Sequence, residues 1–331
     1  MIVVSLVVPV RDEAATLPAL VDSIACQTHQ PDEVVFVDGS SQDDTIAILR
    51  AACESDHRLR VIEAEDATPG RGRNIGIAAA HHDWIALTDA GIRLEPTWLE
   101  RLIEVIENDR SIDVVYGNYE PEINSFFEHC ATLCYVAPKQ TRPGGVMRGP
   151  SIASALIRRD VWRTVGGFPD LRATEDLIFM ERIDQHAYKI GWAPTATVWW
   201  QLRPTLSSTF QKFVVYSMHN VWAGRQWDWH YGLAKKYLAS FPFLVLGLAH
   251  SVWWFSVPVL IFLARVAKNI WVRREDRGIL WLLNPPQFFA TAVVMAAIDL
   301  ATFIGWVRAL IKPQHRGKPA GVVGLPSTLD D

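Results

Sequence analysis

The chain has 331 residues, half of them apolar, and a formal net charge of only -4. This length accommodates a medium-sized domain with an appendage, and the charge pattern favours that division: residues 1–235 carry charge throughout, whereas Leu238 to Ala264 contains no Asp, Glu, Lys or Arg. The nearly balanced charge gives no reason to expect a nucleic-acid partner. The four cysteines lack zinc-finger spacing, so we expect ordinary buried thiols in a reducing compartment.

The N-terminal half alternates short apolar runs with amphipathic stretches. Runs at 2–9, 33–38 and 59–63 are rich in β-branched residues and predict strands. Apolar residues at helical spacing predict helices over 16–27 and about 41–53, where Ser41 and Asp44 resemble a capping box. The alternation predicts an α/β fold with a mostly parallel sheet, right-handed crossovers and helices on both faces.

Trp84 to Ile92 reads as a buried strand that delivers Asp89 to its C-terminal end. Before it, the glycines and proline of Ala67 to Gly76 predict a cationic loop, followed by a helix over 75–80. The second half has a less regular pattern, in which residues 138–145 predict a mobile loop of the kind that often forms a substrate lid. Its remaining expected elements are helices over 96–108, 125–136, 159–165, 177–189 and 205–223, and strands over 113–116, 153–157 and 192–200.

The tail has a different composition. Leu238 to Ala264 exceeds the roughly 20 residues that a helix needs to cross a bilayer. Gln287 to Val307 is a second candidate, but Asp299 interrupts it, so a helix docked on the soluble domain stays an alternative. Basic residues follow both segments, and a simple hairpin would place them on opposite sides of the membrane. The positive-inside rule therefore leaves topology open, including a re-entrant or interfacial first segment.

Acids and arginines gather on the loops next to the predicted strand ends. In an open parallel sheet these loops share one edge. Guanidinium groups match phosphate oxygens there, and carboxylates suit ribose hydroxyls or a metal, so the set suits a nucleoside diphosphate. Taken singly, Asp38 could be a strand-end cap and the arginines a solvated face. The set comprises Arg11, Asp12, Glu13, Asp38, Arg71, Arg73 and Asp89.

Four motifs in order carry a family resemblance. They are Val4-Ser5-Leu6-Val7-Val8-Pro9-Val10-Arg11-Asp12-Glu13, Val37-Asp38-Gly39-Ser40-Ser41-Gln42-Asp43-Asp44-Thr45, Gly70-Arg71-Gly72-Arg73-Asn74-Ile75-Gly76 and Thr88-Asp89-Ala90-Gly91. This series resembles that of family 2 glycosyltransferases with the GT-A fold, and Gly166-Gly167-Phe168-Pro169 and Glu175-Asp176 resemble the later motifs. The likeness covers about residues 2–230.

The resemblance implies an inverting transfer from a nucleoside-diphosphate sugar, with a UDP-sugar expected as donor. Asp176 matches the family's catalytic base, although by itself Glu175-Asp176 reads as a charge pair at a helix start. Arg148, Glu175 and Arg203 are expected on the acceptor side. The expected donor site comprises Pro9, Arg11, Glu13 and Asp38 around base and ribose, Arg71, Arg73 and Asn74 near the diphosphate, and Asp89 and Gly91 from the Asp-x-Asp position.

Gly91 is the departure from the family pattern, because the last Asp of that motif is usually the direct metal ligand. Asp89 is the expected metal ligand, since Mg2+ or Mn2+ can use one carboxylate together with substrate phosphates and water. Arginines are the alternative source of positive charge for the diphosphate. Glycine at this position also lets the backbone approach a ligand closely.

We therefore expect a GT-A domain over 1–235, with a nucleotide-binding half over about 1–117 and an acceptor half over about 118–235. A membrane-associated helical region over 236–312 and a flexible tail over 313–331 follow. The expected location is the cell membrane, with the catalytic domain in the cytoplasm and a lipid-linked or saccharide acceptor.

Two other functions stay open. A sugar-nucleotide nucleotidyltransferase would prefer a glycine-rich loop after the first strand, and residues 10–15 contain no glycine. A catalytically inactive, membrane-anchored sugar-nucleotide-binding subunit draws its support from Gly91.

Overall fold

The structure is a computed structural model that describes residues 2–275, 277–282 and 284–312. By compactness these residues form two units, which we describe separately: the first comprises residues up to 120 and 140–200, and the second comprises 121–139 and 201–312. The tail expected over 313–331 lies outside the described residues. The domain boundaries expected from the sequence stay a prediction.

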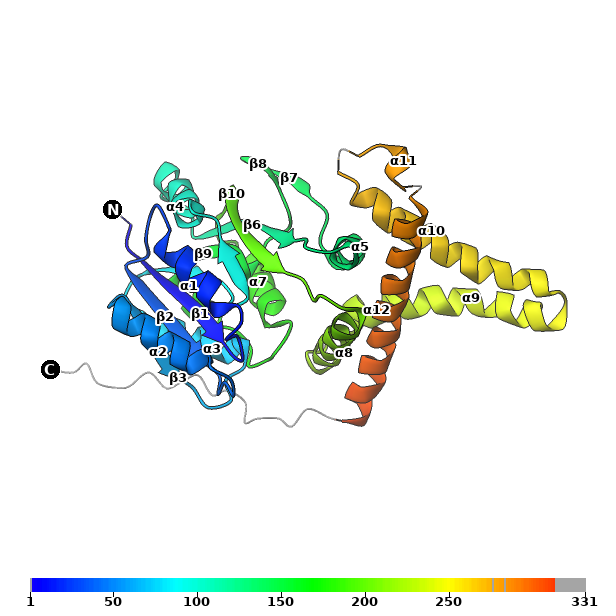
Figure 1. The fold of residues 1–331 in the computed structure, drawn as a ribbon, viewed down its shortest axis with the longest axis horizontal. Helices are drawn as coiled ribbons and strands as arrows, with labels where there is room; N and C mark the ends of the chain where they lie inside the picture. Colours follow the sequence, from blue (N-terminus) through cyan, green and yellow to red (C-terminus); the bar gives the residue numbers. More distant parts are fainter. Residues whose placement is uncertain (1, 276, 283, 313–331) are drawn as a thin grey trace. The chain divides into compact units, whose positions relative to one another are not determined.

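The first unit is built on an eight-stranded sheet with the order β3-β2-β1-β4-β9-β6-β10-β5 (Figure 1). The first four strands in that order are parallel, whereas β9 pairs antiparallel with β4 and β6, and β10 pairs antiparallel with β5. The parallel half matches the prediction. The strands are β1 (Val4–Val10), β2 (Glu33–Asp38), β3 (Leu59–Glu63), β4 (Trp84–Leu87), β5 (Ile92–Leu94), β6 (Val114–Glu122), β9 (Ala155–Arg158) and β10 (Ile190–Gln201).

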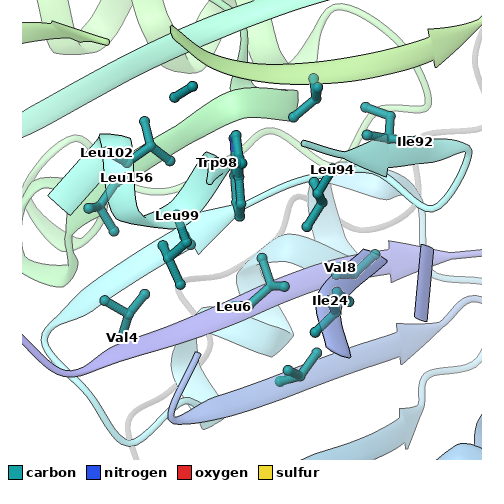
Figure 2. Packing of buried hydrophobic residues seen from close by; sticks show 14 of the residues in the cluster. Val4, Leu6, Val8, Ile24, Ile92, Leu94, Trp98, Leu99, Leu102 and Leu156 are labelled. Carbon is teal, nitrogen blue, oxygen red and sulfur yellow. The ribbon is translucent and has the colours of Figure 1, made fainter. Parts of the chain in front are cut away.

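Helices cover both faces of this sheet, as the sequence predicts. Leu6 and Val8 of β1 face the core that contains α1, α2 and α4, while Val7 faces the core that contains α3, α6 and α7. Figure 2 shows the first core, in which the fully buried Trp98 lies near Leu94 and Leu99. The helices are α1 (Leu17–Ala25), α2 (Thr45–Ser55), α3 (Pro69–Ala79), α4 (Trp98–Asn108), α6 (Arg159–Thr164) and α7 (Glu175–Gln185), with a 3-10 turn η1 (Ile152–Ser154).

The prediction of a loop over Ala67 to Gly76 is wrong, because α3 begins at Pro69 and contains most of this segment. The Thr68 hydroxyl caps the helix by accepting from the Arg71 N–H, and Pro69 occupies the first turn, where no hydrogen bond is lost. The glycines serve close packing rather than a turn. A Cβ on Gly76 would lie 2.4 Å from Val7 Cγ1, and one on Gly72 would lie 3.2 Å from Pro9 Cβ.

Two other local predictions need correction. The capping box of Ser41 and Asp44 does not form: α2 begins at Thr45 without a side-chain cap, and the Ser41 hydroxyl donates to Asp38 instead. The loop expected over 138–145 contains a β-hairpin made of β7 (Gln140–Arg142) and β8 (Gly145–Met147). Pro143 and Gly144 make its tight turn, and Gly144 has a φ of +88° that suits glycine.

The second unit is helical, and its longest helix is α12, which packs along α8 and α5. A Cβ on Gly305 of α12 would lie 2.5 Å from the Val214 carbonyl oxygen of α8, so the two backbones approach closely. Its elements are α5 (Phe126–Tyr135), α8 (Leu206–Trp222), α9 (Gly232–Ala249), α10 (Ser256–Val272), α11 (Ile279–Leu282) and α12 (Pro285–Ile311), with short turns η2 (Trp227–Tyr231) and η3 (Val252–Phe255).

The apolar segment predicted as one span from Leu238 to Ala264 is two helices. α9 ends at Ala249 and α10 begins at Ser256, with η3 between them. Three helical stretches of the described chain are long and apolar enough to cross a membrane: Trp227–Ala249, Val252–Val272 and Pro285–Ile311.

The N-terminal ends of the parallel strands are held together by the buried carboxylate of Glu33. It accepts hydrogen bonds from the Ser5 hydroxyl at 2.6 Å, the Arg60 guanidinium at 2.8 Å and the His81 backbone N–H at 2.9 Å. Burial alone would raise the pKa of Glu33, but these bonds outweigh it and lower the pKa to about 2.

Replacing Glu33 tests this network through the pH dependence of stability. The folded pKa lies below the ordinary value of 4.5, so the carboxylate stabilises the fold above pH 4.5 and the contribution disappears as the pH falls towards 2. We expect Glu33→Gln to lower the free energy of unfolding in urea by about 3 kcal/mol at pH 7, and by progressively less below pH 4.5. Glu107→Gln, at an exposed position on α4, is the control; an equal loss at all pH values would contradict the assignment.

Candidate functional site

The C-terminal ends of the parallel strands carry the site, and the loops there are conformationally strained. Asp12 after β1, Ser40 after β2 and Thr174 before α7 have φ of +55°, +65° and +71°. Non-glycine residues adopt this left-handed conformation rarely and mostly where function requires it.

Asp38 holds the first two loops in shape. Its carboxylate is buried and accepts from the Ser41 hydroxyl at 2.5 Å and the Ser41 N–H at 3.0 Å. Ser41 in turn accepts from the Asp12 N–H, and Asp12 accepts from the Gln42 N–H at 2.7 Å. The loops after β1 and β2 are therefore one hydrogen-bonded body. Both carboxylate oxygens of Asp38 accept hydrogen bonds in it, as a strand-end cap would, and the predicted contact of Asp38 with base or ribose stays a prediction.

Two arginines lie on the exposed side of this edge. The Arg11 guanidinium lies 3.5 Å from the Asp66 carboxylate, and Arg71 donates to the Glu65 carbonyl at 3.3 Å while its side chain stays exposed. Pro9 lies in β1, half-buried, against the start of α3. These positions leave both guanidinium groups reachable from solvent.

Arg73 is the centre of the arrangement. Its side chain is only 4% exposed and donates to Glu175 Oε1 at 2.8 Å and to Asp89 Oδ1 at 2.5 Å. The guanidinium also lies over the Phe168 ring, 5.4 Å from its centroid. Burial alone would lower the pKa of Arg73, but the charges of Asp89 and Glu175 raise it, so the residue stays cationic. One buried cation thus joins helix α3 to the loop after β4 and to the start of α7.

The two acids that begin α7 have raised pKa values. Burial raises the pKa of Glu175 to about 7; Arg73 opposes this shift and the charge of Asp176 adds to it. Burial also raises the pKa of Asp176, against the attraction of Arg73 and with a contribution from Asp89. Asp176 itself is half-buried, and its Oδ1 accepts from the Leu177 N–H at 2.8 Å. A half-exposed carboxylate of raised pKa is suited to accept a proton.

The cluster also contains buried polar atoms without hydrogen-bond partners among the described residues. They are Arg73 Nε, Glu175 Oε2 and the hydroxyl of Thr174. Such atoms are uncommon in folded proteins, and a ligand or an ordered water usually completes their bonding. Thr174 was not expected from the sequence, where only its position before Glu175-Asp176 marks it.

Asn74 contacts the loop before α7, and its predicted place near the diphosphate stays a prediction. Its amide group donates to the Phe168 carbonyl at 2.7 Å and accepts from the Phe168 N–H and from Trp162 Nε1, both at 2.9 Å. Gly167 has a φ of +69°, and a Cβ there would lie 2.8 Å from Asn74 Oδ1. Asn74 therefore fixes the Gly-Gly-Phe-Pro loop that places Phe168 against Arg73, and its amide faces that loop.

Gly91 faces Glu13. A Cβ at Gly91 would meet Glu13 Oε2 at 3.6 Å, an ordinary contact distance. Asp89, with a side chain 44% exposed, uses one oxygen for Arg73 and is the accessible carboxylate of this motif. No group of three or more His, Cys, Asp or Glu side chains among the described residues is arranged to hold a metal ion. The donor set therefore fits a cation that takes one carboxylate and completes its shell with phosphate and water.

The three residues expected on the acceptor side lie in different surroundings. Glu175 lies in the buried cluster. Arg148 is buried against β6, where it donates to Glu120 at 2.8 Å and its backbone N–H donates to Asn118. Arg203 is exposed in the second unit, so its place relative to this site stays a prediction.

Comparisons with known proteins agree with this fold and site. The model of the family described as Glycosyl transferase family 2 matches residues 5–166. The chain is 30% identical over 202 residues to the glycosyltransferase GlyG of Streptococcus pneumoniae, an alignment that covers 56% of this chain and 66% of that relative. It is 26% identical over 229 residues to the O-antigen chain rhamnosyltransferase WbaN of Salmonella anatum, covering 65% and 71% of the two chains.

The fold is also found among solved structures. A mannosyltransferase of Pyrobaculum calidifontis, solved with GDP-Man and Mn2+, superimposes with a TM-score of 0.61 at 18% identity, covering 92% of this chain and 86% of the other. At this identity the likeness establishes the fold alone. The GT-A fold predicted from the sequence is confirmed.

The buried cation predicts a pH-dependent loss of stability in an Arg73 variant. In Arg73→Met the Glu175 carboxylate would stay buried without its partner, which costs about 3–5 kcal/mol when that carboxylate is ionised. Because protonation removes the charge, we expect the deficit in free energy of unfolding to be largest above pH 8 and smaller at pH 5.5.

Arg71→Met is the matched control on the same helix, since its exposed side chain predicts a change within about 0.5 kcal/mol. Urea denaturation at the two pH values measures both variants. A deficit in Arg73→Met that does not depend on pH would show that the pairing with Glu175 is not its cause.

Proposed function

We propose that the chain, whose residues 5–166 match the model of glycosyl transferase family 2, moves a sugar from a UDP-sugar to a lipid-linked or saccharide acceptor with inversion at the anomeric carbon. Its activity as a glycosyltransferase that uses a nucleotide-sugar donor follows from the family. The proposal adds the base of the donor, the stereochemistry, the acceptor class and the residue that takes the proton.

The observation that carries the proposal is the cluster at the sheet edge, where Arg73 holds Asp89 and Glu175 beside Asp176. In an inverting transfer, the acceptor oxygen attacks the anomeric carbon while its proton passes to a carboxylate and the nucleoside diphosphate departs. Asp176 is that general base in our proposal. Its raised pKa makes it a better proton acceptor than an ordinary aspartate, while the charge of Arg73 opposes the shift and favours the ionised carboxylate.

Glu175 has a supporting role in this proposal. Because Glu175 is buried and bonded to Arg73, it positions the start of α7 rather than facing an acceptor. Its pKa near 7 lets it share a proton within the cluster, so that Asp176 and Glu175 need not both carry a full charge.

The departing diphosphate needs positive charge. When bound, Mg2+ or Mn2+ would supply it, held by the accessible oxygen of Asp89 and by the diphosphate itself. Arg11 and Arg71, both reachable from solvent at the same edge, are the cations of this chain that we propose to assist.

The second unit supports the proposed location, and a relative supports the proposed acceptor. Three helices long and apolar enough to cross a membrane support membrane association, with the catalytic unit on the cytoplasmic side, where nucleotide sugars are available. The relative named as an O-antigen chain rhamnosyltransferase supports a saccharide chain as acceptor. A membrane-anchored subunit that binds the sugar nucleotide without transferring it is the second candidate, favoured by the absence of a carboxylate at Gly91.

Asp176→Asn separates these two functions. We expect the variant to lose at least about 100-fold in transfer or donor hydrolysis, because an amide cannot accept the proton. UDP binding, measured by thermal shift, is expected to stay within twofold of the wild type. Asp184→Asn, exposed on the same helix, is expected to keep full activity. A wild type that binds UDP but neither hydrolyses nor transfers the donor would support the binding subunit.

Gly91→Asp tests the metal site independently of turnover. There is space for the side chain beside Glu13, so the variant should fold, and the second carboxylate adds a ligand next to Asp89. We expect the Mn2+ concentration that gives half of the UDP-dependent thermal shift to fall by about 10-fold. Gly91→Asn, of the same size but neutral, should show a smaller change; equal midpoints for Gly91→Asp and the wild type would place the metal elsewhere.

A further inference from the structure

Helices α9 and α10 form an antiparallel pair that we call the apolar hairpin, defined as Tyr237–Ala264. Figure 1 shows the two helices side by side, joined at the η3 turn. Near this turn Phe243 stacks on Trp254, and a Cβ on Gly247 would lie 2.6 Å from the Phe255 ring. These contacts pack the tip of the hairpin tightly, so the segment between α9 and α10 is an ordered turn.

The outer surface of the apolar hairpin is exposed and apolar. Leu248 is 83% and Trp253 is 80% exposed, and both lie close to the tip. A water-soluble surface rarely exposes so many large apolar side chains together, so this surface is suited to an apolar environment. Further exposed members are Leu238, Phe241, Leu244, Val245, Val252, Val259, Leu260 and Ile261.

The charge-free length of each arm fits one leaflet rather than a whole bilayer. The first arm runs from Tyr237 to Ala249 and the second from Val252 to Ala264, which is 13 residues each. At 1.5 Å per residue an arm is about 20 Å long, whereas the hydrocarbon core is about 30 Å thick. The longer apolar stretches that contain these arms reach 21 to 23 residues only by including charged positions.

Those charged positions all lie outside the arms, on the side of the open end. Asp228, Lys235 and Lys236 precede the first arm, and Arg265 and Lys268 follow the second, so four of the five are basic. The tip contains no Asp, Glu, Lys or Arg, and only His250 and Ser251 stand between its apolar residues. A hairpin whose open end is positively charged and whose tip is apolar is suited to a lipid bilayer, where anionic headgroups cover the hydrocarbon.

A polar cluster at the base marks where the apolar part ends. Asp299 of α12 accepts a hydrogen bond from Arg265 at 2.6 Å and from the Tyr237 hydroxyl at 2.7 Å. Tyr237 is the first residue of the first arm, and Arg265 directly follows the last residue of the second arm, so both arms are joined to α12 at the base. The acid that interrupts the second apolar segment is thus paired with a cation at the base. Placing this cluster at headgroup level keeps all three polar groups out of the hydrocarbon.

We propose that the apolar hairpin enters one leaflet of an anionic lipid bilayer and turns back inside it, so that its tip does not reach the opposite side. This rests on the membrane association included in the proposed function and specifies its form. Both ends of the hairpin then stay on the same side of the membrane, with Lys235, Lys236, Arg265 and Lys268 at the headgroups.

Single cysteines distinguish the possible arrangements. Ser251→Cys places a thiol at the tip and Lys236→Cys places one at the base, each in a chain whose Cys26 and Cys53 are replaced by serine. In sealed vesicles containing phosphatidylglycerol, a membrane-impermeant maleimide should label Lys236→Cys from one side. It should label Ser251→Cys from neither side until detergent is added. Labelling of Ser251→Cys from the side opposite to Lys236→Cys would overturn the proposal in favour of two crossings, and labelling from the same side would show that the tip is not inserted.

Vesicle flotation tests the anionic leaflet directly. The wild type should bind vesicles of phosphatidylcholine mixed with phosphatidylglycerol more strongly than pure phosphatidylcholine. Leu248→Asp, with a charge near the tip, should bind roughly 100-fold more weakly. Val3→Asp, at an exposed apolar position of the first unit, is the matched control and should bind as the wild type does. Unchanged flotation of Leu248→Asp would overturn the proposal.

A thermal shift with UDP separates this proposal from the catalytic one. Leu248→Asp should keep the wild-type shift, which shows that the variant is folded and that only lipid binding is lost. A wild type that inserts as proposed but shows no shift with UDP would instead contradict the proposed donor.

Discussion

The buried guanidinium of Arg73 is the constraint on which the catalytic unit depends. A cation with a side chain 4% exposed requires anionic partners, and here they come from two other segments: Asp89 after β4, 16 residues away, and Glu175 at the start of α7, 102 residues away. Satisfying one charge therefore fixes three elements at the same sheet edge. The same arrangement raises the pKa values of Glu175 and Asp176, because it brings two adjacent acids into a poorly solvated position.

Close backbone packing makes that pairing geometrically possible. A Cβ on Gly70 would lie 2.0 Å from the Pro169 carbonyl oxygen and 3.2 Å from Glu175 Cβ, so only glycine lets α3 lie against the loop before α7. The Asn74 side chain binds the backbone of that loop at Phe168, and the Phe168 ring lies against the Arg73 guanidinium. The motif from Gly70 to Gly76 thus contains residues that contact the loop before α7 and hold it in place.

The second unit uses one buried ion pair in a similar way. Asp299 and Arg265 neutralise each other where α9, α10 and α12 meet, and beyond this point the hairpin carries no Asp, Glu, Lys or Arg. In the first unit the buried pair organises a polar reaction site, whereas here it marks the limit of an apolar surface. In both units, the need to pair a buried charge places helices that are distant along the chain.

The sequence alone determined the parallel half of the sheet and the layers of helices, and it carries the resemblance to family 2 glycosyltransferases, because hydrophobic periodicity and ordered motifs are local signals. It also identified Arg73, Asp89, Glu175 and Asp176 as candidates, although their roles at the site stay proposals. Only tertiary structure decided what Asn74 and Arg73 contact, because hydrogen-bond partners 94 and 102 positions away leave no local pattern. The sequence also cannot distinguish the glycines of α3 from those of a loop, because glycine occurs both in turns and where a helix packs closely. Here the close contact with β1 requires them.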